Sequence, residues 1–139
     1  MIDPIEALIA AMAQDADLNA LVDGQIAERH KFGDGWDIPS TAIQVQLADG
    51  ETDWHCRTQR PRVEVRCYGK TRPEAMQVYG AVVTFSRSKA HRKVVETSQG
   101  KALVYWFLMD SGPSLLIEED MGVDFVLVYA KMAVAEQDV

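Results

Sequence analysis

The chain has 139 residues, of which 47% are hydrophobic and 25% are charged, as expected for one ordinary globular domain. No apolar run approaches the roughly 18 residues of a membrane-spanning helix, and the acidic beginning of the chain lacks the basic region of a signal peptide. The formal net charge of −7 argues against binding nucleic acids through their phosphates.

The first predicted element is a helical segment over residues 3–22. Asp3 can cap its N-terminus, a proline follows at the first helical position, and Glu6 can complete a capping box. The step Asp15-Ala16-Asp17 predicts a break into a helix and a short second turn. The pair Asp23-Gly24 then ends the segment.

Two strands and a loop are predicted next. Residues 25–32 predict a short edge strand, and residues 33–39, which are rich in glycine, predict a loop. Apolar and polar residues alternate over residues 41–47, which predicts a strand with one face in solvent or against another subunit. Residues 48–57 are predicted to be a polar connection.

A strand and a helix between Gln59 and Lys89 form the unit with the clearest sequence signals. Apolar and mostly charged residues alternate in the strand, as in a half-buried strand, and Cys67 is expected to be a packed thiol. Gly69 ends the strand, and Thr71 with Glu74 forms a capping box. The apolar positions are Val63, Val65 and Cys67 in the strand, and Ala75, Val78, Tyr79, Val82 and Val83 in the helix.

The last part of the chain predicts further strands. Residues 91–97 form one, and residues 102–109, eight apolar residues in a row, predict a strand covered on both faces. Covering the second face requires another layer or a neighbouring subunit. Residues 114–117 predict a short strand or loop, and residues 123–134 predict the last strand.

Together these elements predict an α+β fold with a mixed, mostly antiparallel sheet and two helices packed on one face, in the order α-β-β-β-α-β-β-β. We expect a single domain over residues 1–139 with a short flexible C-terminal tail from about residue 135.

No established catalytic, nucleotide-binding or metal-binding motif occurs in the chain. His55 and Cys56 could meet Cys67 and His91 at a metal ion, although the spacing matches no zinc pattern. A nucleophilic Cys–His pair would lack a third orienting group. We therefore expect no catalytic, cofactor or metal site, and a small metal-dependent enzyme remains an alternative hypothesis.

Five segments follow one another along the chain: the helix at residues 3–13, residues 18–26, Ile38–Val45, Arg62–Ala75 and the final strand at residues 123–134. In this order and at this chain length, they resemble the tail-terminator (tail-completion) proteins of long-tailed phages and related particles. The resemblance covers nearly the whole chain, and its motifs are structural, not catalytic. The aromatic run at residues 105–107 and the loop around Trp36 depart from the family pattern.

The resemblance implies a virion protein of the tail and neck region that assembles in the host cytoplasm. It implies a homo-oligomer, a hexameric ring that ends polymerisation of the tail tube at its head-proximal end and joins the tail to the head connector. The partners would be the tail tube protein and the head–tail connector (stopper) protein. DNA would pass through the lumen without specific binding, and no membrane would be involved. The alternatives are another neck component, a stopper or adaptor between portal and tail, and a dimerising binding module.

Candidate contacts with other subunits or partners are expected in three loops, residues 31–39, 49–57 and 110–121. Tryptophan is enriched at the energetic centres of interfaces, although Trp36 could also fold back onto the core. The acidic run after residue 117 could equally be a solvated turn. The candidate interface residues are Trp36, Asp37, Trp54, Glu118, Glu119 and Asp120.

Overall fold

The computed structural model describes residues 2–28, 41–53, 58–118 and 123–137. Within them the chain forms three helices and seven strands, and the predicted α+β class with a mixed, mostly antiparallel sheet is confirmed. None of the described helices is long and apolar enough to cross a membrane. The elements are α1 (Pro4–Ala13), α2 (Ala16–Leu21), β1 (Ile26–Glu28), β2 (Ala42–Asp53), β3 (Thr58–Gly69), α3 (Arg72–Ser88), β4 (Lys93–Thr97), β5 (Gly100–Met109), β6 (Ser114–Glu118) and β7 (Val123–Glu136).

The strands form one sheet in which β7 pairs with three others. The hydrogen-bonded order is β1-β2-β3-β7-β5-β4, and β6 pairs with β7. In the described sheet β1 and β2 are parallel, and the other pairs are antiparallel. β5 and β6 follow one another along the same side of β7, because Met109 is opposite Ala130 and Ser114 is opposite Leu127.

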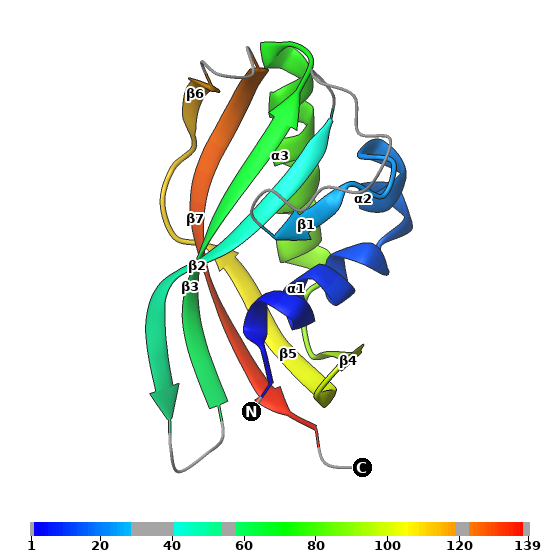
Figure 1. Cartoon of the computed structure of the whole chain (residues 1–139), viewed down its shortest axis with the longest axis vertical. Coiled ribbons are helices and arrows are strands. Elements are labelled where there is room, and N and C mark those ends of the chain that lie inside the picture. The colour runs from blue at the N-terminus through cyan, green and yellow to red at the C-terminus, as the bar shows by residue number, and fades with distance from the viewer. Residues whose placement is uncertain (1, 29–40, 54–57, 119–122, 138–139) are drawn as a thin grey trace.

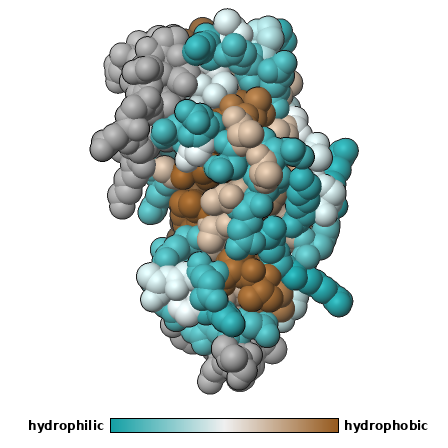
Figure 2. Space-filling model, turned by 90° about the vertical axis from the view of Figure 1, so that its right-hand side faces the viewer, coloured by the Kyte–Doolittle hydropathy of each residue, from teal (hydrophilic) through white to brown (hydrophobic). Residues whose placement is uncertain are grey.

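The helices cover one face of this sheet (Figure 1). Residues from α1, α2 and α3 share a single apolar core with the inward-facing residues of the strands, so the expected helix layer on one face is confirmed. Seen from the helix side, the outer surface is largely hydrophilic, with small separate apolar patches (Figure 2). The largest fully buried side chains of the core include Leu8, Met12, Leu18, Ile43, Val65, Phe85, Phe107 and Met132.

The turn from β3 into α3 has the predicted glycine and the predicted Thr71 cap. A Cβ atom on Gly69 would lie 2.3 Å from the backbone nitrogen of Ala75, so a side chain does not fit there. Thr71 Oγ1 accepts a hydrogen bond of 3.4 Å from the backbone N–H of Glu74, whose carboxylate accepts one of 2.9 Å from the N–H of Lys70. The bond to Thr71 satisfies an N–H group that the first helical turn leaves without a partner and marks where α3 begins. The Glu74 carboxylate bonds to the N–H of Lys70, one residue before the Thr71 N–H that a capping box uses.

The N-terminal cap of α1 differs from the prediction in one bond. Asp3 accepts hydrogen bonds from the backbone N–H groups of Ile5 (2.9 Å) and Glu6 (3.4 Å), as expected. The predicted capping box is nevertheless wrong, because the Glu6 carboxylate accepts bonds from the N–H and hydroxyl of Ser98, at 2.6 and 2.9 Å. Ser98 offers two donors to one carboxylate, and the contact ties α1 to the turn between β4 and β5.

The predicted polar connection over residues 48–57 is wrong for its first part, because β2 continues to Asp53. The register shifts between Leu47 and Asp49, which marks a bulge. Beyond it the strand lacks apolar alternation, and cross-strand pairing sets Asp49 opposite Arg62. A Cβ atom on Gly50 would lie 2.4 Å from the Cα of Pro61, so only glycine allows the two strands to approach here.

The element order contains one helix and one strand more than predicted. The short second turn is the helix α2, and residues 114–117 lie in the strand β6. The expected edge strand at residues 25–32 is observed as β1, and the predicted loop at residues 33–39 lies outside the described residues. β7 extends to Glu136, beyond the predicted end at Val134.

Candidate functional site

The face of the sheet opposite the helices, which we call the helix-free face, carries a second, smaller cluster of buried side chains. Tyr68 lies next to Phe125 with ring centroids 5.3 Å apart, and its hydroxyl donates a 3.0 Å hydrogen bond to the side-chain oxygen of Gln44. Both Tyr68 and Gln44 are buried. Tyr68 follows Cys67 and so lies on the side of β3 opposite the apolar positions, which the alternation predicts to be in solvent. The cluster consists of Ala42, Tyr68, Val123 and Phe125, with Leu127 packed against it.

Arginines from β3 stack on aromatic rings of β7 across this face. The guanidinium of Arg62 lies 4.2 Å from the centroid of the Tyr129 ring, and that of Arg66 lies 5.0 Å from the centroid of Phe125. Cation–π contacts of this kind contribute roughly 0.5–1 kcal/mol at exposed sites. They hold planar, charged groups flat against the sheet instead of extending them into solvent.

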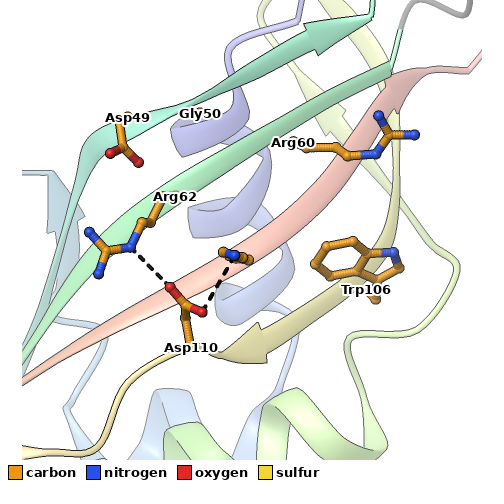
Figure 3. A pocket seen from close by; sticks show the side chains of 7 residues that line it. Asp49, Gly50, Arg60, Arg62, Trp106 and Asp110 are labelled. Carbon is orange, nitrogen blue, oxygen red and sulfur yellow. Dashed lines mark hydrogen bonds and ion pairs between the residues drawn. The ribbon is translucent and has the colours of Figure 1, made fainter.

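A charged hollow of about 600 Å³ lies farther along the same face (Figure 3). The strand register explains its composition, because Asp49 in β2, Arg62 in β3 and Lys131 in β7 are cross-strand neighbours. Like charges placed directly opposite on adjacent strands repel, so Arg62 and Lys131 need a carboxylate nearby. The residues that line the hollow are Asp49, Gly50, Arg60, Arg62, Trp106, Asp110 and Lys131.

Asp110 supplies that carboxylate from the break between β5 and β6. It accepts a 3.0 Å hydrogen bond from Nε of Arg62 and lies 3.6 Å from Nζ of Lys131 (Figure 3). The hydrogen bond from Arg62 is the main reason that the pKa of Asp110 lies below its usual value, and the charge of Lys131 adds to it. The backbone N–H groups of Asp110 and Ser111 both bond to the carbonyl of Tyr129, at 2.8 and 3.3 Å. Asp110 thus links a positive charge of β3 to one of β7.

The chemistry of the helix-free face suits binding better than catalysis. A carboxylate with a lowered pKa remains charged near neutral pH and is a poor general acid or base. The Cys67 thiol lies on the opposite face, where burial raises its pKa to about 12, so it is a packed thiol as predicted and is not activated as a nucleophile. Among the described residues, no three His, Cys, Asp or Glu side chains come together as a metal site would require. His55 and Cys56 lie outside these residues.

Among the described residues, the apolar run of β5 is fully buried on only one face. Ala102, Val104 and Phe107 are buried, whereas Tyr105 and Leu108 are 39% and 46% exposed. The exposed apolar character continues into β6, where Leu115 is 43%, Leu116 is 41% and Ile117 is 66% exposed. The coverage of both faces expected from sequence is therefore absent within the described residues of the single chain.

The predicted interface residues fall almost entirely outside the described part of the chain. These are Trp36, Asp37, Trp54, Glu119 and Asp120. The backbone of Glu118 forms the end of β6. Of the predicted interface loops, those starting at residues 49 and 110 contribute Asp49 and Asp110 to the hollow. Sequence reasoning missed Arg60, Arg62, Trp106 and Lys131, which lie in strands and meet only through register.

Comparison with known proteins gives a likeness of fold. No protein-family model matches the chain, and no curated protein matches it. Among solved structures, it is similar to a chain of the structure described as "Virion of native gene transfer agent (GTA) particle", with 12% sequence identity and a TM-score of 0.63. The match covers 90% of this chain and 89% of the other. The two proteins therefore share nearly their whole fold, and the second one is part of a virus-like particle.

Proposed function

We propose that this protein is a structural component of a phage-like virion and acts as a tail terminator. In this role, six copies form a ring at the head-proximal end of the tail tube, end its polymerisation and join the tail to the head connector. The observation that carries the proposal is the likeness of fold to a virion chain over 90% of the sequence. The order and length of the segments that resemble tail-terminator proteins supply the finer assignment.

The helix-free face supports a role in assembly. It combines aromatic residues with stacked arginines, which are residue types enriched where proteins contact each other. The charged hollow on the same face adds groups that can fix the orientation of a partner. The exposed apolar residues of β5 and β6 border this face, and their burial would favour association with another chain. In contrast, the Cys67 thiol is buried and its pKa is raised, which does not favour a role as a nucleophile.

The net charge is consistent with a channel for DNA. Each copy carries a formal charge of −7, and a ring multiplies this charge around a common axis. Negative charge that faced the lumen would repel phosphates and keep DNA from adhering during its passage.

Electron microscopy of particles assembled without this gene tests the proposal. A terminator predicts overlong or uncontrolled tail tubes that are detached from filled heads. Tails of normal length beside leaking heads would overturn this role and would assign the protein to the connector side, as a stopper or adaptor. Particles indistinguishable from wild type would remove the protein from tail assembly altogether.

A further inference from the structure

β6 is a short apolar strand at which the described part of the sheet has an open edge. Among the described strands it pairs only with β7, so one row of its backbone N–H and C=O groups has no strand partner there. Leu115, Leu116 and Ile117 occupy its middle positions, and Ile117 is 66% exposed. Proteins usually protect such an edge with charge, a bulge or cover. An unprotected apolar edge is the type of surface to which another strand adds.

β4 is the strand that best complements this edge. Like β6 it has five residues, it ends the hydrogen-bonded order of the sheet, and its Val94 is 47% exposed. The N–H of Arg92 bonds to the carbonyl of Tyr105 in β5. Since N–H groups in an antiparallel pair alternate in direction, those of Lys93, Val95 and Thr97 point away from β5. β4 and β6 lie at opposite ends of the molecule (Figure 1).

The charges around the two strands have opposite sign. Residues 114–124 contain four acidic residues and no Lys or Arg, whereas residues 87–93 contain four Lys or Arg residues and no acid. Two β6 strands placed together would bring acidic segments into the same interface. A β6 strand beside a β4 strand would instead set an acidic segment against a basic one, which favours encounter and fixes orientation.

We infer that β6 of one copy pairs antiparallel with β4 of a second copy and so extends the sheet from one subunit into the next. This inference rests on the proposed ring and specifies its interface. In the joined sheet, the helices of both copies lie on the same side only under one condition. Residues on the helix-free face of β6 must lie opposite residues on the helix-free face of β4. Leu116 pairs with Phe125 on the helix-free face, and Val94 pairs with Leu103 on that same face.

This condition fixes the register. Leu116 of one copy lies opposite Val94 of the next, and Leu115 lies opposite Val95 on the helix side. The same register sets Glu118, at the end of β6, level with Arg92, which directly precedes β4, so an acidic and a basic residue come close together. Because β6 and β4 are different surfaces, each copy offers one of each, and the contact repeats from head to tail. Such a contact closes into a ring when its rotation closes.

Disulfide trapping between two single-cysteine variants tests the inference. Leu116→Cys and Val94→Cys are prepared separately in a chain that also carries Cys56→Ser. The only native cysteine left in each variant is then Cys67, which is buried. The full-length variants are mixed at high concentration and oxidised. We expect a disulfide-linked dimer in the mixture and only background dimer in either variant alone, because directly opposite Cβ atoms lie close enough for a disulfide. Dimer in Leu116→Cys alone would show pairing of β6 with β6, and no dimer in the mixture would show that the edges do not meet; either result overturns the inference.

A charge-reversal series controls for folding and register. Arg92→Glu with Lys93→Glu, placed in the Val94→Cys chain, is expected to reduce the cross-link, and Glu118→Lys in the partner chain is expected to restore it. Circular dichroism of each variant confirms that the fold is intact, and restoration shows that a loss was not due to unfolding. Unchanged cross-linking in the reversed chain would contradict the charge argument. The cross-link and the tail length test different proposals. If the cross-link forms but particles without the gene have normal tails, the interface stands and the terminator role is rejected. If those particles have overlong tails but no cross-link forms, the terminator role stands and the interface is rejected.

Discussion

The two faces of the sheet hold their side chains in place by different kinds of interaction. On the helix-covered face, Val63, Val65 and Val128 are fully buried, and the attraction between such residues depends on buried area and not on direction. On the helix-free face, Tyr68 bonds to Gln44, and Arg62 is held by Asp110 and the ring of Tyr129. The first face stabilises the fold, and the second presents specific, oriented groups that a partner can recognise.

Adjacent residues of β5 allow the largest test of this comparison. Phe107 is fully buried on the covered face and contacts Phe85 edge-on, with ring centroids 6.1 Å apart. We expect Phe107→Ala to lower the free energy of unfolding by about 3–5 kcal/mol, since it removes an aromatic side chain and leaves a cavity. Chemical denaturation of the purified chain measures this loss.

The matched control is Leu108→Ala, one position along on the other face. Leu108 is 46% exposed, and we expect its substitution to change the free energy of unfolding by only about 0.5 kcal/mol. Equal losses for the two variants would show that the faces do not differ in the way the structure indicates.

A smaller effect is expected from Tyr68→Phe on the helix-free face. The substitution keeps the ring contact with Phe125 but removes the hydroxyl that bonds to the buried Gln44. A buried polar group left without its partner costs about 1–3 kcal/mol, and thermal or chemical denaturation would detect this loss. Tyr105→Phe, at an exposed ring, is the control and should be close to neutral. A neutral Tyr68→Phe variant would show that the hydroxyl is not needed to order this face.

The covered face was predictable from sequence because its signals are local. Alternation placed Val63, Val65 and Cys67 on one side of β3, and the Thr71–Glu74 pair marked the start of α3. The polar half of β2 was missed because its pairing depends on opposite charges in β3, which no local pattern in β2 reveals. Glu6 was assigned to the wrong bond for the same reason, since its partner Ser98 is far away in the sequence.

The candidate site was less predictable because it arises from register. Arg62 and Lys131 each occupy a solvated position of an alternating strand, and nothing in either segment indicates that the two are neighbours. The bulge between Leu47 and Asp49 adds a residue and brings Asp49 beside them. Predicting the hollow would have required the strand order and two register shifts, the one at the β2 bulge and another between Val104 and Trp106 where β5 pairs with β7. Predicting the core required only the period of each segment.

The smallest expected effect is the change with pH in the stability that Asp110 contributes to the fold. The hydrogen bond from Arg62, and then the charge of Lys131, lower its pKa in the folded chain below the value of about 3.9 that is usual for aspartate. The folded chain thus binds a proton at lower pH than the unfolded chain does. The stabilising contribution is fully present above the unfolded pKa and is lost as the pH falls through the lower folded pKa.

An NMR titration of the Asp110 carboxyl measures this pKa directly. Its midpoint should lie below the usual value in the wild type and move upward in Arg62→Gln. Lys131→Gln should raise it less, because Lys131 lies at 3.6 Å and Arg62 donates a bond of 3.0 Å. If Arg62→Gln left the midpoint unchanged, the two groups would not be joined in solution. The hollow would then be a set of separate charges, and the helix-free face would lose the oriented character that distinguishes it from the covered face.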